Sequence, residues 1–244
     1  MVKYSVVFCY RNRAEHLAIT VPQIRKVLEE QGEVEMIVIE QDDDQPFRRG
    51  NLLNEGAKLA TGDIIILHDA DYYPANNTVY FDGNVDVFLP IKQVEFVKND
   101  LTIRPLEEVP SGYRKFKDSV DDNFFGGVIS FKRDAFFKCG GYSPLYKGWG
   151  LEDQDLRERI NEHHLTTARG TGKFLALEHA DSAPVKSDIN FQNNMRIFAL
   201  WKNFLQYGAR SQICSKEFIT SPQLGVDKWM KVKNFDILTG ADKR

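Results

Sequence analysis

The segment IIILHDADYYP, Ile64 to Pro74, indicates the fold class of this 244-residue chain. Its first four residues, three isoleucines and a leucine, predict a buried strand, and the strand leads almost directly into Asp69 and Asp71. A carboxylate pair at the end of a buried strand is costly unless a cation, a helix terminus or water lies beside it. The segment therefore predicts a buried sheet with an acidic site at its edge.

The residues before this segment show a regular alternation of strands and helices. Their patterns predict strands at Val6–Phe8 and Glu35–Gln41 and helices at Leu17–Leu28 and Asn51–Leu59. Strand–helix–strand–helix–strand is the pattern of an α/β protein with a parallel, doubly wound sheet. Ligands bind such sheets at the carboxyl ends of the strands, which is where the acids and the loop YRNR are predicted to lie.

The second half of the chain is less regular. Its predicted strands are Val85–Ile91, Val128–Phe131 and Phe174–Leu177, and its predicted helices are Leu151–His163 and Asn190–Tyr207. No repeat, low-complexity tract or linker interrupts it, so we expect one domain over residues 1–244. No GxGxxG follows the first strand, which argues against a dinucleotide dehydrogenase.

The composition indicates a globular protein without a nucleic-acid or membrane role. The formal net charge is -3, so no basic field favours nucleic acid, and no apolar run approaches the ~20 residues of a membrane span. Three cysteines without paired spacing, Cys9, Cys139 and Cys214, argue for a reducing compartment. We therefore expect a cytoplasmic protein with no membrane span and no nucleic-acid partner.

Two acidic motifs suggest chemistry. For Asp69-Ala-Asp71, a divalent cation shared with phosphates and a solvated turn both remain open. The second motif, GWGLEDQD (Gly148 to Asp155), begins a predicted helix, where acids also favour the positive end of the helix dipole. That explains its acids but not a tryptophan between two glycines. The tryptophan predicts a mobile hinge with a stacking surface, beside a carboxylate that can act as a base.

Arginines lie near the ends of the first two predicted strands. They occur in YRNRAEHL (Tyr10 to Leu17) and RRGNLLN (Arg48 to Asn54). Arginine is suited to binding phosphate and the edge of uracil, although surface arginines on loops are the alternative for either motif alone.

In this order the segments resemble the β-1,4-galactosyltransferase family and its bacterial chondroitin-polymerase relatives. The matching segments span about residues 4 to 238. They are YRNRAEHL, RRGNLLN, HDADYYP, FFGGV (Phe124 to Val128), GWGLEDQD, His179 after a short strand, and LGVDKWMKVKN (Leu224 to Asn234). The resemblance implies the GT-A glycosyltransferase fold, a Rossmann-like doubly wound mixed sheet in a single domain. Residues 1–75 would form the nucleotide-binding half, and residues 76–244 the acceptor-binding half with the C-terminal helix and tail.

The resemblance also implies a reaction and a site. Family members move a sugar from a UDP-sugar to a glycan hydroxyl with inversion, using Mn²⁺. Asp153 would be the base, and Glu152 would position donor or acceptor hydroxyls. The metal ligands would be Asp71 and His179. The donor would be held by Arg11, Arg13, Arg49, Asn51, Asp69, Asp71, Gly127 and Trp149, with Trp149 on a lid.

The chain departs from the family pattern at several points. Ala176 stands where the animal enzymes often have a methionine ligand, so we expect Mg²⁺ to substitute partly for Mn²⁺. Phe124 replaces a tyrosine that helps to select the sugar; galactose or N-acetylgalactosamine is favoured, and others stay open. The anchor, stem and disulfides of the animal Golgi enzymes have no counterpart, which leads us to expect a bacterial or viral cytosolic form.

Two other functions remain as alternatives. A nucleotidyltransferase is also α/β and metal-dependent, but it would not need the Gly-Trp-Gly lid. A non-catalytic module that binds UDP-sugar or glycan would not need both Asp71 and Asp153.

Overall fold

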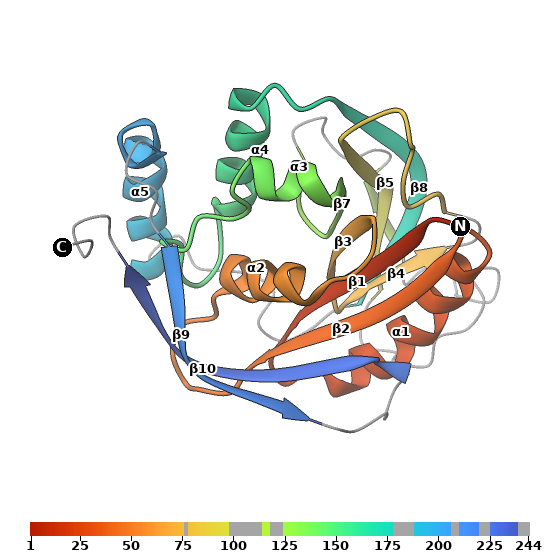
Figure 1. Ribbon diagram of the computed structural model, residues 1–244, viewed down its shortest axis with the longest axis horizontal. Coiled ribbons are helices and arrows are strands. Elements are labelled where there is room, and N and C mark those ends of the chain that lie inside the picture. The colour runs from red at the N-terminus through yellow and green to blue at the C-terminus, as the bar shows by residue number, and fades with distance from the viewer. Residues whose placement is uncertain are drawn as a thin grey trace.

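The computed structural model describes residues 1–75, 78–97, 114–117, 124–177, 188–205, 210–219 and 225–238 (Figure 1). Its elements in chain order are β1 (Lys3–Tyr10), α1 (Ala14–Glu29), β2 (Glu33–Gln41), α2 (Arg49–Leu59), β3 (Ile64–Asp69), β4 (Tyr72–Ala75), β5 (Val87–Val97), β6 (Arg114–Lys117), β7 (Val128–Lys132), α3 (Arg133–Lys138), α4 (Glu152–Glu162), β8 (Thr167–Leu177), α5 (Ile189–Leu205), β9 (Arg210–Ile219) and β10 (Lys228–Leu238).

The described strands form one mixed sheet. Its order is β4-β8-β5-β7-β3-β1-β2-β10-β9, with β6 paired to β5. The first three strands pair in parallel, β3 with β1 and β1 with β2, while β7 runs antiparallel to β3. Strands β2 and β3 thus lie on opposite sides of β1 in the sheet. The loops that follow β1 and β3 therefore diverge at the carboxyl ends of these strands, which is the usual ligand site of a doubly wound sheet.

Two apolar cores cover the two faces of the sheet. Alternate residues of β1 divide between them: Val6 and Phe8 pack in the core that contains α1, whereas Val7 packs in the core that contains α2 and α4. All three residues are fully buried. Because side chains alternate across a strand, a nearly continuous apolar run such as β1 requires helices on both faces. Figure 1 shows α1 and α2 on opposite sides of β1.

The prediction of an α/β, doubly wound mixed sheet is confirmed, with two local corrections. A solvated turn was one of the two interpretations of the segment around Asp71, but residues 72–75 form β4, which pairs antiparallel with β8. The strand predicted at Phe174–Leu177 begins seven residues earlier, at Thr167, because β8 also pairs in parallel with β5. Both pairings join segments that are distant in the sequence, so local periodicity gave no signal for them.

The last described strand returns to the N-terminal part of the sheet. β10 pairs in parallel with β2 and antiparallel with β9. Lys228 of β10 contacts Glu35 Oε2 of β2 at 2.9 Å, and Asp227 accepts a hydrogen bond from the Met36 amide at 2.6 Å. The C-terminal part of the chain therefore completes the sheet beside β2.

No helix in the described ranges is long and apolar enough to span a membrane. Cys9 and Cys139 are free thiols, and both are buried.

Candidate active site

Arg49, the first residue of α2, lies at the centre of the candidate site. Its Nε donates to Asp69 Oδ1 at 2.7 Å, and its Nη1 donates to Asp153 Oδ1 at 2.8 Å. Nη1 also lies 3.9 Å from Glu152 Oε1. The side chain is 11% exposed, so these are largely desolvated ion pairs. One guanidinium thus joins the acid at the end of β3 to the acids that begin α4. The sequence had named Asp69, Glu152 and Asp153 as site residues but had not predicted this connection.

The site holds more negative charge than Arg49 can neutralise. Burial raises the pKa of Asp69 above its usual value; Arg49 opposes the rise, and the charge of Asp71 adds to it. Burial also raises the pKa of Glu152, with the charge of Asp153 adding to the effect and Arg49 opposing it. Four carboxylates around one guanidinium leave a net negative potential, which favours a bound cation.

The first turn of α4 presents Glu152 and Asp153 to the site. Leu151 precedes the helix with a left-handed backbone, φ 74°. Glu152 is buried, and its Oε2 accepts a hydrogen bond from the Gly150 amide at 3.0 Å. Asp153 is 22% exposed, so its carboxylate remains accessible. The two adjacent acids therefore differ in environment: one braces the preceding loop, and the other faces the site.

Tyr142 belongs to this network although the sequence did not single it out. Its hydroxyl donates to Asp153 Oδ1 at 3.0 Å and accepts from Arg49 Nη1 at 3.1 Å. The Arg49 guanidinium also lies over the Tyr142 ring, 5.6 Å from its centroid. The only local signal was the preceding Gly140-Gly141 pair, which indicates a turn and no function.

Gly127 lies where a side chain has no room, while its role in donor binding stays a prediction. Its φ is +79°, and a Cβ at this position would lie 2.7 Å from the Tyr72 ring. Its carbonyl accepts a hydrogen bond from the Asp69 amide at 2.8 Å. A Cβ on the neighbouring Gly126 would lie 3.1 Å from Asp153 Oδ2. The glycine pair therefore brings the backbone between the two acidic motifs with no side chain of its own.

Trp149 is 60% exposed. Its ring is tilted relative to that of Phe191 of α5, and the two ring centroids lie 5.8 Å apart. This exposure shows that the side chain is not packed in the core. The loop that carries Trp149 is held by Asn194 of α5, whose amide donates to the carbonyls of Lys147 at 2.9 Å and Gly150 at 3.0 Å. Asn194 is 1% exposed, and the sequence had indicated only an amphipathic helix there. Helix α5 thus supports the Gly-Trp-Gly loop.

The arginines after β1 lie near a second loop. Arg11 Nη1 donates to the carbonyl of Gln45 at 2.7 Å, and its guanidinium lies 5.1 Å from the centroid of the Phe47 ring. Arg13 is the residue immediately before α1, and its carbonyl accepts a hydrogen bond from Leu17. Arg11 therefore links the ends of β1 and β2. The donor-binding roles of both arginines stay predictions.

Asn51 lies in the first turn of α2 but is 1% exposed. Its amide nitrogen and oxygen are buried and make no hydrogen bond in the described part of the chain. In this conformation the amide therefore does not reach solvent, and its predicted contact with the donor stays a prediction.

The residues present fit a divalent cation in part. Asp69 and Asp71 supply the carboxylate oxygens that Mn²⁺ and Mg²⁺ accept, in a site with excess negative charge. The Leu177 amide donates to the Asp71 carbonyl at 2.8 Å, which ties the end of β8 to this position. The predicted ligand His179 falls outside the described residues. Within them, no group of three or more His, Cys, Asp or Glu residues gathers as a metal site.

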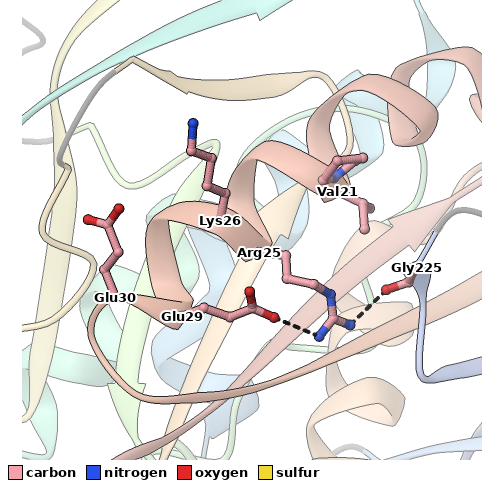
Figure 2. A pocket seen from close by; sticks show the side chains of 7 residues that line it. Val21, Arg25, Lys26, Glu29, Glu30 and Gly225 are labelled. Atoms are coloured by element: carbon pink, nitrogen blue, oxygen red, sulfur yellow. Dashed lines mark hydrogen bonds and ion pairs between the residues drawn. The ribbon is translucent and has the colours of Figure 1, made fainter.

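A separate hollow of about 500 Å³ lies over α1 (Figure 2). Arg25 crosses it, donating to the Gly225 carbonyl at 2.7 Å and lying 3.6 Å from Glu29. None of the acids around Arg49 lines this hollow. Arg25 also forms an ion pair with Asp227 at 2.7 Å, so its guanidinium binds the segment before β10. We therefore place the active site at Arg49 and not in the hollow over α1.

Two family models match the chain, and both describe glycosyltransferases. Residues 1–84 match a family model described as the N-terminal region of glycosyl transferase group 7. Residues 114–180 match one described as the N-terminal domain of galactosyltransferase. Together the two models cover more than half of the chain.

Individual relatives agree with the family models. Over 186 residues the chain is 32% identical to β-1,4-galactosyltransferase 6 of Mus musculus, an alignment that covers 72% of this chain and 44% of that protein. Over 189 residues it is 33% identical to a β-N-acetyl-D-glucosaminide β-1,4-N-acetylglucosaminyl-transferase of Lymnaea stagnalis, covering 74% and 35% of the two chains. The matched region thus spans less than half the length of these two relatives.

A solved structure confirms the fold. The chain superposes with a TM-score of 0.65 on a mutant of Drosophila β-1,4-galactosyltransferase 7 in complex with manganese, UDP-Gal and xylobiose. The match covers 98% of this chain and 94% of that one, at 20% identity. The predicted GT-A fold is therefore confirmed.

Proposed function

The chain belongs to the β-1,4-galactosyltransferase family, and we propose that it is an inverting, metal-dependent glycosyltransferase that moves a sugar from a UDP-sugar to a hydroxyl group of a glycan. The observation that carries the proposal is the bridge that Arg49 makes between Asp69 and Asp153. It joins an acid suited to the donor's cation and nucleotide to an acid suited to activating the acceptor. The complex of the Drosophila relative with manganese, UDP-Gal and xylobiose supports the same reaction class.

Asp153 has the position of the catalytic base in this proposal. Its carboxylate is partly exposed and takes the proton of the acceptor hydroxyl as that oxygen attacks the anomeric carbon. The new glycosidic bond forms on the face opposite the breaking bond to the UDP oxygen, so the configuration inverts. Arg49 helps to orient Asp153, because its Nη1 donates a hydrogen bond to Oδ1 of that carboxylate at 2.8 Å.

Glu152 is suited to binding sugar hydroxyls and is less suited to act as the base. Burial raises its pKa, and one of its oxygens already accepts the Gly150 amide. Its other oxygen lies 3.9 Å from Arg49 Nη1 and can accept or donate a hydrogen bond, according to protonation.

Asp71, with His179 as the predicted second ligand, would hold Mn²⁺, and Asp69 would lie in its outer shell or contact the ribose. When bound, the cation supplies positive charge to the diphosphate of the departing UDP. Arg49 would supply the protein's own positive charge beside this position, since its Nε donates to Asp69 Oδ1 at 2.7 Å.

Galactose and N-acetylgalactosamine are the favoured donor sugars in this proposal. Phe124 stands near Gly126, with its ring 3.5 Å from the position of a Cβ there. It offers no hydroxyl to the sugar, so selection depends on shape and on the acids of α4. The relative from Lymnaea stagnalis is named for transfer of N-acetylglucosamine, so that donor belongs in any test.

The test is a panel of UDP-sugars in which UDP release is measured with and without acceptor saccharides, in the presence of Mn²⁺. We expect one or two donors to give UDP release that rises when a β-linked acceptor is added. Release of inorganic diphosphate would instead indicate a nucleotidyltransferase. Binding of UDP-sugar with no turnover for any acceptor would indicate a non-catalytic module.

A further inference from the structure

Tyr142 occupies a place that packing alone does not require. Its hydroxyl lies between Arg49 Nη1, at 3.1 Å, and Asp153 Oδ1, at 3.0 Å, although the residue is only 1% exposed. A phenylalanine would fill the same space and keep the Arg49 guanidinium over its ring. The hydroxyl is therefore the informative part of this side chain, because it places a hydrogen-bond donor on the candidate base.

The backbone around Tyr142 is held so that the hydroxyl has little freedom. Asn54 donates its amide to the Tyr142 carbonyl at 2.8 Å and accepts the Tyr142 amide at 2.9 Å. A Cβ on Gly50 would lie 2.7 Å from the Tyr142 Cβ, and Gly141 has φ +63°. The tyrosine is therefore held in place by a side-chain amide that pairs with both of its backbone groups and by the close approach of Gly50 to its side chain.

The consequence falls on the orientation of Asp153. In the part of the chain that the structure describes, the hydrogen bonds to this carboxylate, from Arg49 and from Tyr142, both reach Oδ1. Oδ2 is directed toward Gly126, where a Cβ would lie 3.1 Å away. Two donors on one oxygen restrain rotation of the carboxylate, so the second oxygen is left for the acceptor hydroxyl.

We infer that Tyr142 is a positioning residue for the transfer reaction: its hydroxyl orients the Asp153 carboxylate so that Oδ2 faces the acceptor. The inference rests on the proposed function. It goes beyond it by assigning a role to a residue outside the acidic and arginine motifs. Tyr142 is 1% exposed and acts through Asp153.

Tyr146 provides a matched control on the same loop. Its hydroxyl donates to Asp155 Oδ1 at 3.3 Å, and the residue is also buried, at 4% exposure. Asp155 is paired with Arg159, not with Arg49. Tyr146→Phe therefore removes the same chemical group from the same type of partner, an aspartate two residues after Asp153 on α4.

The experiment measures kcat and the donor KM for Tyr142→Phe and Tyr146→Phe, alone and combined with Asp153→Asn. We expect Tyr142→Phe to lower kcat about tenfold with the donor KM within about twofold, because orientation of the base is lost but donor binding is not. Tyr146→Phe should stay within about twofold of wild type. In the Asp153→Asn background, Tyr142→Phe should cost nothing further, since there is no base left to orient.

Equal losses in the two tyrosine variants, or the same loss with and without Asp153, would overturn the inference and leave the proposed function standing. A wild-type chain that releases no UDP from any donor would overturn both.

Discussion

Leu177 donates its backbone N–H to the carbonyl oxygen of Asp71 at 2.8 Å, so the end of β8 is bonded to the segment that follows β3. Position 179 follows two residues later in the chain. This contact supports the hypothesis that His179 and Asp71 share a cation, which the motif order had suggested.

The first prediction concerns that cation. Chelator should abolish transfer, Mn²⁺ should restore it better than Ca²⁺, and Mg²⁺ should restore it in part, since the ligands are carboxylate, imidazole and phosphate oxygens. His179→Ala should weaken Mn²⁺ binding at least tenfold in the presence of UDP, measured by electron paramagnetic resonance of free Mn²⁺. His163→Ala, at the end of α4, is the control. Full turnover in excess chelator would contradict the prediction.

The second prediction separates chemistry from binding. Asp153→Asn keeps the size of the side chain but removes the proton acceptor, so kcat should fall by ~10²–10⁴. The affinity for UDP-sugar, measured by calorimetry, should change little. Glu158→Gln, on the same helix and paired with Arg157, is the control. A near wild-type rate in Asp153→Asn would assign the base to Glu152 or Asp155.

The third prediction tests the backbone at Gly127. Gly127→Ala places a Cβ 2.7 Å from the Tyr72 ring in a backbone with φ +79°, so it should lower the free energy of unfolding by about 1–3 kcal/mol. Gly83→Ala meets no heavy atom within 4 Å and should have little effect. Urea denaturation of the two variants checks this, and equal midpoints would show that the segment relaxes without cost.

The fourth prediction concerns stability against pH. Burial raises the pKa of Glu35, but hydrogen bonds from Ser5, Lys228 and Thr61 outweigh burial and lower this pKa from 4.5 to about 2. A carboxylate with a lowered folded-state pKa stabilises the protein above its unfolded value, and that contribution is lost as pH falls from 4.5 toward 2.

The Glu35 contribution should be about 2 kcal/mol at neutral pH, allowing for partial screening by solvent. Urea midpoints at pH 7 and pH 3 measure it. Glu35→Gln should be less stable than wild type at pH 7, and the difference should shrink at pH 3. A difference that stays constant across this range would show that Glu35 acts through packing and not through its charge.

The fifth prediction is that Trp149 moves when donor binds. The residue is 60% exposed, with its ring beside that of Phe191. Closure over a ligand should therefore bury the ring and shift its fluorescence to shorter wavelength on addition of Mn²⁺ and UDP. The shift should vanish in Trp149→Phe, which retains Trp201 and Trp229. A shift that persists in this variant would assign the signal to another tryptophan and contradict the lid.

Local patterns were sufficient for the elements that alternate regularly. The strands and helices from β1 to β3 lie within a few residues of the predicted ranges, because burial on one or both faces imposes a period on the sequence that needs no distant partner. β4 was missed for the opposite reason. Tyr72-Tyr73-Pro74 has the composition of a turn, and it becomes a strand only because β8 supplies its hydrogen bonds.

The acids, arginines and glycines of the site were recognisable as motifs, but their connections were not. Arg49 was predicted to be one donor-binding residue among several, and the structure makes it the group that joins Asp69 to Asp153. Tyr142 and Asn194 had no local signature at all. Their partners lie on other elements, so only the packed chain brings a tyrosine hydroxyl to a carboxylate or a helix amide to a loop carbonyl.

The α/β class, the doubly wound order of the first strands and the acidic motifs could all be predicted from the residues alone. These follow from hydrophobic period and from the order of segments along one chain. The folded chain was needed to show which charges meet, which acid stays accessible and which side chains hold them. Those outcomes depend on distances between segments remote in sequence and on desolvation, and both are set when the sheet and its helices close around Arg49.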